Sequence, residues 1–451
     1  MPPLAGRNDL RVTVNAGARL DCLPVSAFHR RILILIGIGM FFDGYDVYVA
    51  ATVLGATLNS HFSTLAQNAQ FVSVTFIGMM IGSFLTGFLG DRYGRRFTYQ
   101  ANLIIFGLAS IASAFAPTML VLILLRGVMG VGLGAEMVAG YAAMTEFLPP
   151  QARGRWCGIL NAVVVTSLPV SALASTLLIP RFGWRLMFVI GGVGALIVWY
   201  LRKAMPESPR WLESIGRIDE TEAMLQKIES EVGLYHKLPE PAASGPAVPS
   251  RNFAALFGPG LASRLFVGAT TLIVANTLIY GFVTWLPTFF VQQGLSIANS
   301  FRYSFLMTIG APVGAVIGSL TADSIGRKPA IIGASLFTII SGSVYPFIRD
   351  PVVLPIAGFL LVVPIYILVA LLFAIYIPEL FPTDVRMRAV GFCNTLGRAA
   401  TIVTPFLVVF LFRAYGVGGV VTLMIGLLIL QIFVVHFFGI EPKLRRLEQM
   451  E

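Results

Sequence analysis

Two aspartates spaced as helix neighbours lie where acidic side chains are rare. Asp43 and Asp46 interrupt an apolar run that reaches from residue 32 to about residue 58. A helix of that length crosses a bilayer, and an ionisable side chain at such depth marks by default a pathway or a proton relay. The i, i+3 spacing puts both carboxylates on one helix face. We predict that they take up and release protons, the alternative being neutral or paired structural groups.

Three further charged residues lie inside later apolar runs. Arg126 and Glu136 share one run, and Arg398 lies in another. Counted along the helices, both aspartates and Arg126 fall near the middle of the membrane, so an Asp–Arg pair is feasible. Glu136 follows Arg126 by ten residues, about 15 Å of helix, which is too far for a direct pair. We predict that Glu136 is a third proton-coupling group, in the inner half of the pathway.

The two arginines within the spans are candidates for holding an anion. A guanidinium stays charged and grips a carboxylate through a planar fork of donors. Arg126 and Arg398 are therefore predicted to bind substrate, the alternative being structural pairs with a carbonyl or a nearby acid. Burial favours the neutral form of a carboxylate and an arginine favours the charged form, so Asp43 or Asp46 would switch as substrate displaces its partner.

Aromatic side chains within the spans are candidates for stacking on a flat substrate. The candidates are Tyr45, Tyr48, Tyr280, Trp285, Tyr366 and Tyr376. Of these we select four as predicted substrate contacts: Tyr45, Tyr280, Trp285 and Tyr366. The alternative is packing or a belt at the membrane surface, where such residues are common.

The elements that must position these residues are membrane helices. The chain of 451 residues is 56% hydrophobic and only 12% charged, against about a quarter charged in a soluble protein. Its apolar residues fall into twelve runs, near 32–57, 70–90, 97–115, 118–144, 156–179, 184–201, 265–291, 302–322, 330–348, 352–377, 389–412 and 417–438. The first run is too long for a signal peptide. We predict an all-α membrane protein with twelve transmembrane helices.

The basic residues lie mainly on one side of these helices. With the N-terminus inside, the inner loops carry 25 of the 32 Lys and Arg, and the outer loops carry five. Arg126 and Arg398 are the remaining two. This is the positive-inside pattern, which predicts a multi-pass protein of the plasma or inner membrane with both termini in the cytoplasm. The net charge of +10 is thus a matter of topology, and no nucleic-acid partner is implied.

Neither metal nor cofactor chemistry is indicated. Cys22, Cys157 and Cys393 have no metal-ligand spacing and suggest no disulfide framework. The glycine-rich stretch after Arg126 has no βαβ unit around it, so it is not a dinucleotide fingerprint, and close helix packing explains it better. We expect no catalytic residues, no cofactor and no enzymatic activity.

The apolar runs divide the chain into two groups of six. We predict a cytoplasmic N-terminal tail of loose order and a cytoplasmic linker with short helices, including one over residues 219–231, between the two bundles. The predicted boundaries are 1–28 for the tail, 29–201 for the first six-helix bundle, 202–263 for the linker, 264–440 for the second bundle and 441–451 for a cytoplasmic tail.

The two groups repeat one another. Glu146-x-x-Pro-x-x-x-Arg153-x-Arg-x-x-Gly-x-x-Asn returns as Glu379-x-x-Pro-x-x-x-Arg386-x-Arg-x-x-Gly-x-x-Asn at an offset of 233 residues. Asp-Arg-Tyr-Gly-Arg-Arg at 91–96 returns as Asp-Ser-Ile-Gly-Arg-Lys at 323–328. Many secondary transporters are built from such repeats, with sites at the interface. The charged residues within the spans do not recur in the second group. At the offset of 233 residues, Arg126 corresponds to Phe359. We infer that shared residues form scaffold and gate, and unshared ones the chemistry.

These motifs carry a family resemblance over residues 30–440. Gly-Phe-Leu-Gly-Asp-Arg-Tyr-Gly-Arg-Arg at 87–96 resembles the signature loop of the major facilitator superfamily, and Arg-x-x-x-Gly-x-Gly-x-Gly at 126–134 resembles its span-4 motif. Asp-Gly-Tyr-Asp in the first span is similar to the aromatic acid:proton and metabolite:proton symporters. Pro-Glu-Ser-Pro-Arg-Trp-Leu at 206–212 also resembles sugar porters, so it discriminates poorly.

The resemblance implies two pseudo-symmetric six-helix bundles and a set of residues that gate the cytoplasmic side without touching substrate. Positive-inside anchoring alone is the alternative reading of these residues. They are Gly87, Asp91, Gly94, Arg95, Arg96, Glu146, Arg153, Asp323, Gly326, Arg327, Glu379 and Arg386.

The function expected from these observations is proton-coupled uptake of a small organic anion, such as an aromatic carboxylate, by a monomer in the lipid bilayer. Three alternatives stay open. A sugar or polyol porter would carry a Gln-Gln-x-Ser-Gly motif in span 7, where this chain has Ala-Asn-Thr-Leu-Ile-Tyr-Gly. A drug:proton antiporter would carry a Gly-Pro motif in span 5, where this chain has Thr-Ser-Leu-Pro-Val. A non-transporting nutrient sensor would need an output element, and the linker is the only candidate.

Overall fold

The chain folds into helices throughout the part described by the structure, a computed structural model covering residues 14–233, 256–381 and 385–441. In the first half they are α1 (Ala16–Asp21), α2 (Ala27–Asn59), α3 (Leu65–Tyr93), α4 (Arg95–Ala114), α5 (Met119–Phe147), α6 (Pro150–Phe182), α7 (Arg185–Leu201), η1 (Arg202–Ala204), α8 (Pro209–Ser214) and α9 (Ile218–Gly233). In the second half they are α10 (Leu261–Gly281), η3 (Val283–Trp285), α11 (Leu286–Gln292), α12 (Ile297–Thr308), α13 (Gly310–Ile325), α14 (Arg327–Val344), η4 (Tyr345–Phe347), α15 (Val353–Val369), the π-helical η5 (Ala370–Tyr376), α16 (Ile377–Glu379) and α17 (Arg386–Phe438).

Twelve membrane spans follow from these helices. Eleven stretches of the described residues are long and apolar enough to cross a membrane. The last of them covers 51 residues, about twice the length that one crossing needs, and non-helical Gly416 divides it into two spans. The predicted twelve-helix membrane fold is confirmed.

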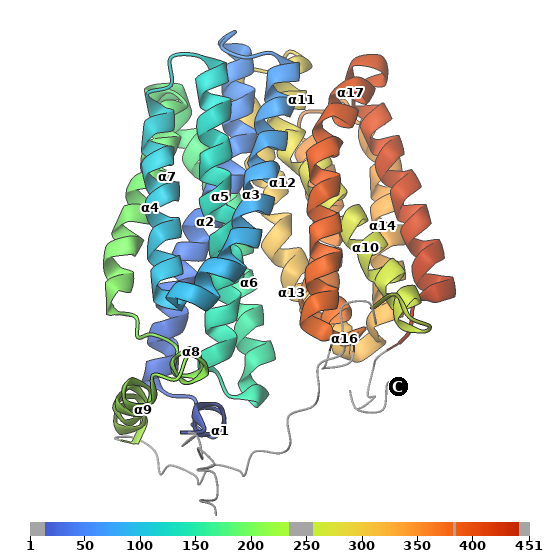
Figure 1. Ribbon diagram of the computed structural model, residues 1–451. Helices are drawn as coiled ribbons and strands as arrows, with labels where there is room; N and C mark the ends of the chain where they lie inside the picture. The colour runs from blue at the N-terminus through green and yellow to red at the C-terminus, as the bar shows by residue number, and fades with distance from the viewer. Residues whose placement is uncertain (1–13, 234–255, 382–384, 442–451) are drawn as a thin grey trace, which may run out of the picture.

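Each set of six spans forms its own bundle, which we call the N half and the C half. In the N half α5 packs on α3 and α4, and α2 packs on α6; in the C half α10 and α14 pack on α17, and α13 on α15. Figure 1 shows the two halves side by side, the N half in blue to green and the C half in yellow to red. The glycines of α5 allow close packing, since a Cβ on Gly130 would lie only 3.2 Å from the Cα of Gly78 on α3.

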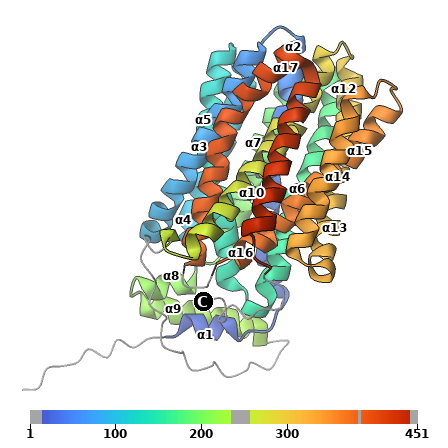
Figure 2. The ribbon, with the colours of Figure 1, turned by 90° about the vertical axis from the view of Figure 1, so that its right-hand side faces the viewer.

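A third layer of short helices lies at one end of the N half, which we call the layer end. It consists of α1, α8 and α9, seen below the bundles in Figures 1 and 2. Glu213 of α8 accepts hydrogen bonds from the backbone N–H groups of Asn15 (2.7 Å) and Ala16 (2.9 Å), and Arg19 pairs with Glu222 and Glu229 of α9. The expected loose order of the N-terminal tail is therefore wrong for α1, which these acids hold in place.

The two halves touch along α3 and α17 and along α6, which packs on α12, α13 and η5. At the end opposite the layer α2 packs against α11, and near the middle of their spans the rings of Phe76 and Tyr280 lie 4.5 Å apart. At the layer end the described ion pairs stay within one half: Arg95 pairs with Glu146, and Arg327 with Glu379. The described parts of the two halves therefore touch along several helices, and their ion pairs at the layer end do not cross from one half to the other.

Candidate functional site

Arg126 forms a buried ion pair with Asp46 inside the N half. Helix α5 places the arginine opposite α2, where its Nη1 donates to the Asp46 carboxylate and its Nη2 to the Asp46 carbonyl oxygen at 3.0 Å. Its Nε donates to Thr75 Oγ1 at 3.2 Å, and both ionic side chains are at most 1% exposed. The structure thus makes the Asp–Arg pair that the helix depths allow.

A second buried pair, between Arg202 and Glu136, lies nearer the layer end. Arg202 Nη1 donates to the Glu136 carboxylate, and Nε and Nη2 donate at 2.9 Å to the carbonyl oxygens of Leu35 and Ile36 on α2. Its side chain is 1% exposed. The sequence predicts Arg202 as the first residue of the cytoplasmic linker. This is wrong for its side chain, because the guanidinium extends from η1 into the N half and binds these acceptors.

Gly39 makes room for that guanidinium. A Cβ at this position would lie 2.6 Å from Arg202 Cζ, too close for any side chain to fit without moving the arginine. The glycine comes one helical turn before Asp43 on α2, so the sequence placed a small residue and an acid on one face. This is the weak signal that could have indicated a buried partner.

Asp43 lies between the two pairs without one of its own. It is 3% exposed, and neither carboxylate oxygen has a hydrogen-bond partner among the described residues. It is close enough for the charges of Glu136, Arg202 and Asp46 to act on it. Among the described residues, the interior of the N half therefore holds two fully buried arginine–carboxylate pairs with an unpaired acid between them.

Four tyrosines and Arg398 form a second group, which we call the tyrosine–arginine cluster. The N half supplies Tyr48 of α2 and Tyr141 of α5, and the C half supplies Tyr280, Tyr366 and Arg398 from α10, α15 and α17. Tyr48 lies close enough to the other three tyrosines, and Arg398 close enough to Tyr280, for their charges to act on one another. Tyr366 is fully buried and the other members are partly exposed. The cluster spans the boundary between the halves.

Arg398 crosses that boundary to neutral groups. Its Nη1 donates to Ser83 Oγ at 2.9 Å and to the Met79 carbonyl oxygen at 3.4 Å, and its Nη2 lies 3.9 Å from Met137 Sδ. No carboxylate pairs with it in the described part of the chain. Arg398 thus differs from Arg126 and Arg202, each of which holds an acid.

The other predicted aromatic contacts lie elsewhere. Tyr45 donates to Met187 Sδ at 3.6 Å in the core of the N half, and Trp285 stacks on Phe289 in the core of the C half. Tyr141, which the sequence did not single out, belongs to the cluster instead. It follows Glu136 by five residues on a helix rich in glycine and alanine, so no pattern distinguishes it from a packing residue.

The residues predicted to gate lie at the layer end of each half, in matching arrangements. Arg95 pairs with Glu146 at 3.0 Å, and Arg327 with Glu379 at 2.9 Å. Glu207 accepts hydrogen bonds from the backbone N–H groups of Arg95 and Arg96 at the start of α4. Glu441 accepts hydrogen bonds from the backbone N–H groups of Arg327 and Lys328 at the start of α14. A carboxylate suits these orphan donors and the positive end of the helix.

Tight turns precede both helix starts, at Gly94 (φ 95°) and Gly326 (φ 103°), in a conformation that favours glycine. Arg153 instead turns to the helical layer, donating to Asp21 at 2.6 Å. The side chains of Asp91, Asp323 and Arg386, and residue Gly87, lie outside the parts that the structure describes in side-chain detail.

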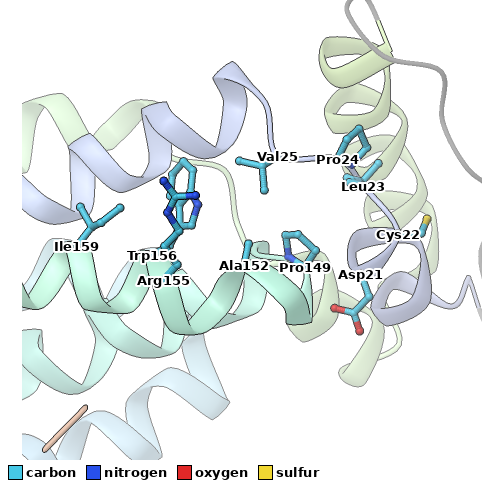
Figure 3. Close-up of a pocket in the computed structure, with 10 residues that line it drawn as sticks. All are labelled: Asp21, Cys22, Leu23, Pro24, Val25, Pro149, Ala152, Arg155, Trp156 and Ile159. Atoms are coloured by element: carbon cyan, nitrogen blue, oxygen red, sulfur yellow. The ribbon is translucent and has the colours of Figure 1, made fainter. Parts of the chain in front are cut away.

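A cavity of about 670 Å³ opens between the α1–α2 connection and the start of α6. Figure 3 shows Asp21, Val25, Pro149 and Trp156 among its lining residues. Its one acid, Asp21, is already held by Arg153 and Arg210 at 2.6 Å each. The cavity lies at the helical layer and shares no residue with the two charged groups above. Among the described residues, no three His, Cys, Asp or Glu side chains are placed to hold a metal ion.

Comparison with known proteins gives one consistent result. A family described as "Sugar (and other) transporter" matches residues 32–451. The chain is 36% identical over 443 residues to the inner membrane metabolite transport protein YdjE of Escherichia coli (strain K12), covering 96% of this chain and 98% of that protein. It is 30% identical over 439 residues to the niacin transporter NiaP of Acinetobacter baylyi, covering 96% and 99%.

The fold is similar to that of a solved transporter. The partially occluded inward open conformation of the xylose transporter XylE from E. coli superposes with a TM-score of 0.73, covering 92% of this chain and 100% of that one at 17% identity.

Proposed function

Since the chain belongs to the sugar (and other) transporter family of the major facilitator superfamily, we propose that it is a proton-coupled symporter for a small organic anion, with aromatic monocarboxylates as the substrate class. It is a multi-pass membrane protein whose relatives are transporters and not enzymes. The substrate would cross by alternating access, in which the halves open in turn to each side.

The observation that carries the anion assignment is the set of partners around Arg398. Arg398 is only partly exposed, and its partners among the described residues are a hydroxyl, a carbonyl and a thioether, so no carboxylate there balances the charge of its guanidinium. A substrate carboxylate would supply that charge through the two-pronged geometry that arginine favours. Because Arg398 belongs to the C half and its partners Ser83 and Met79 to the N half, a bound anion would contact both halves.

The four tyrosines favour an aromatic ring next to that carboxylate. They combine flat apolar faces with hydroxyl groups, which suits a ring bearing a polar substituent. A relative that is 30% identical is named a niacin transporter, and niacin is an aromatic carboxylate. Tyr280 of the C half and Tyr48 and Tyr141 of the N half are partly exposed and would contact such a ring, whereas Tyr366 is fully buried beside them.

Proton coupling is proposed for the acids of the N half. A buried ion pair such as Asp46–Arg126 and an unpaired acid such as Asp43 are groups whose protonation a membrane transporter can use. The helical layer and both termini are assigned to the cytoplasm by the positive-inside pattern. On that assignment α2 of the N half packs on α11 of the C half at the outer end, and the described gating pairs at the inner end each stay within one half. The described conformation would then face inward, the state in which substrate and proton are released.

Transport by purified protein in lipid vesicles tests this function. We expect an inward-directed proton gradient to drive accumulation of radiolabelled nicotinate or benzoate, and excess unlabelled acid to exchange with it. Arg398→Gln should abolish both, whereas Gln293→Ala, at the end of α11 and outside the cluster, should change neither. Accumulation of hexoses in place of the acids would refute the anion assignment.

A further inference from the structure

We propose that Ser83 is a positioning residue for the substrate carboxylate. It holds one nitrogen of the Arg398 guanidinium, so that another edge of the guanidinium takes the carboxylate through two parallel hydrogen bonds. This inference rests on the proposed binding of an organic anion at Arg398. It adds a mode of binding and a residue of the N half that determines it.

The contacts of Arg398 leave one edge of its guanidinium open. Nη1 is the nitrogen that donates to Ser83 Oγ at 2.9 Å and to the Met79 carbonyl oxygen at 3.4 Å. In the described part of the chain Nε makes no hydrogen bond, and Nη2 has only the weak acceptor Met137 Sδ at 3.9 Å. The edge formed by Nε and Nη2 can therefore bind a further group.

Other arginines of the protein hold carboxylates by this same edge. Arg19 donates from Nε and Nη2 to the two oxygens of Glu229, at 2.7 Å each. Arg327 donates from the same two nitrogens to the two oxygens of Glu379, at 2.9 and 3.0 Å. Such paired hydrogen bonds add geometric specificity to the charge attraction. A substrate carboxylate would complete the same arrangement on Arg398.

Met137 of α5 occupies one of the two positions that the carboxylate oxygens would take. Arg398 and Met137 are each partly exposed. A methionine side chain is flexible, and its sulfur is a weak acceptor, so a charged oxygen replaces it at Nη2 with little loss. The bonds of Nη1 to Ser83 and Met79 need not break when the anion binds.

The hydroxyl of Ser83 is oriented to accept from the arginine. Ser83 Oγ lies 2.7 Å from the carbonyl oxygen of Met79 and 3.0 Å from that of Gly134 on α5, so its one proton is directed to these backbone acceptors. A hydroxyl that donates in this way presents its lone pairs to another donor, which here is Arg398 Nη1. Ser83 therefore connects α3, α5 and the guanidinium of α17.

Close packing fixes the backbone around Ser83. A Cβ on Gly82 would overlap the carbonyl oxygen of Val131, and a Cβ on Gly134 would overlap that of Met79. Helices α3 and α5 thus meet here without side chains between them, and neither can move closer to the other. The N half therefore sets the position of Nη1 and the direction of the open edge.

The repeat in the C half has the same packing without the serine. At the offset of 232 residues between the two Asp-x-x-Gly-Arg loops, Gly82 corresponds to Gly314 and Ser83 to Ala315. A Cβ on Gly314 would overlap the carbonyl oxygen of Val363 on α15. The helix pair packs closely whether or not a hydroxyl follows this glycine. Packing alone therefore does not explain Ser83.

Equilibrium binding of labelled nicotinate and benzoate to the purified full-length protein tests this role. We expect Ser83→Ala to raise the dissociation constants of both acids about five- to ten-fold, as for one lost hydrogen bond. Nicotinamide and benzamide carry no charge for the guanidinium to bind, so the concentrations at which they displace labelled acid should change by less than about two-fold. Ser83→Thr keeps the hydroxyl and should bind both acids within about two-fold of wild type.

Ser73→Ala is the matched control. Ser73 lies on the same helix and donates at 2.7 Å to the Ile402 carbonyl oxygen of α17, so this variant loses a hydrogen bond between the halves that does not involve Arg398. It should leave binding of both acids unchanged. Unchanged or tighter binding of the acids by Ser83→Ala, or an equal loss for acids and amides, would overturn the positioning role alone. A wild type that binds neither acid would overturn the proposed function itself.

Discussion

The N half and the C half share a fold but differ in what they bury. Both place a glycine turn and an Arg–Glu pair at the layer end. The N half also encloses three carboxylates and two arginines that are at most 3% exposed, whereas the buried polar residues described in the C half are uncharged. The difference shows that helix packing needs none of these charges, since the repeat folds without them.

Buried ion pairs are weak contributors to stability. Desolvating each ion costs several kcal/mol, and apolar replacements of a whole pair are often neutral or stabilising. The N half therefore keeps two such pairs for a reason other than its fold. Arg398 of the C half contacts the N half through Ser83. We assign it, like the two buried pairs, to transport and not to the stability of the fold.

The sharpest way to break this comparison is to remove one partner of a pair. Arg126→Met leaves the Asp46 carboxylate buried without compensation, so we expect the free energy of unfolding to fall by about 3–5 kcal/mol. The double variant Arg126→Met, Asp46→Leu should recover most of that stability while remaining inactive in transport. Denaturant unfolding of the purified proteins measures both. Equal instability of the single and double variants would mean that the pair holds the fold.

An arginine-to-methionine replacement at Arg398, at the boundary between the halves, should reduce substrate binding without lowering stability. Arg398→Met removes a guanidinium whose partners are neutral, so we expect stability to be unchanged or higher. Loss of a charge-assisted contact of about 1.5–3 kcal/mol should lower apparent affinity for nicotinate or benzoate by roughly ten- to a hundred-fold. Equilibrium binding of labelled acid measures this, and Arg398→Lys serves as the variant that keeps the charge. Unchanged binding would remove Arg398 from the substrate site.

Much of this organisation is readable from the chain, for physical reasons. Twelve apolar runs predict twelve spans because a bilayer leaves few other solutions, and the depth of Asp46 and Arg126 follows from helix rise. The buried position of the Arg202 guanidinium could not be predicted from the sequence. A long side chain at the end of a span can extend several ångströms back into that span, and its place in the sequence does not show this. Tyr141 could not be predicted from the sequence. The face of α5 that lies toward the other half depends on how the two halves pack together.

One glycine in each half allows the packing around Arg202 to be compared with packing at a site that has no buried charge. Gly39 on α2 lies against Arg202, whereas a Cβ added to Gly333 on α14 would meet no atom within 4 Å. Gly39→Ala should displace the guanidinium and cost about 1–3 kcal/mol of stability, as overpacking does. Gly333→Ala should be neutral or slightly stabilising, because alanine loses less backbone entropy in a helix. Thermal unfolding of the two variants side by side checks this. Equal behaviour would show that Arg202 is free to move.

The smallest expected effect concerns the helical layer, which in the described residues packs on the N half. Arg19 lowers the pKa of Glu222 by hydrogen bonding to it, and Gln226 contributes to the same direction. Because this folded pKa lies below the unfolded value, the stabilisation is present above the unfolded pKa of about 4.5 and is lost as pH falls through the lowered value. The pair is partly exposed, 18% for Arg19 and 38% for Glu222, and water screens it, so it contributes less than about 1 kcal/mol.

Hydrogen exchange of the α1 amides is therefore expected to quicken slightly between pH 7 and the acid range, after correction for intrinsic rates. Glu222→Gln should produce the same small increase at pH 7 and make it insensitive to acid. Arg19 keeps Glu229 as a second partner in that variant, which is why α1 should stay docked. Complete loss of α1 protection in Glu222→Gln would show instead that the layer depends on this one pair.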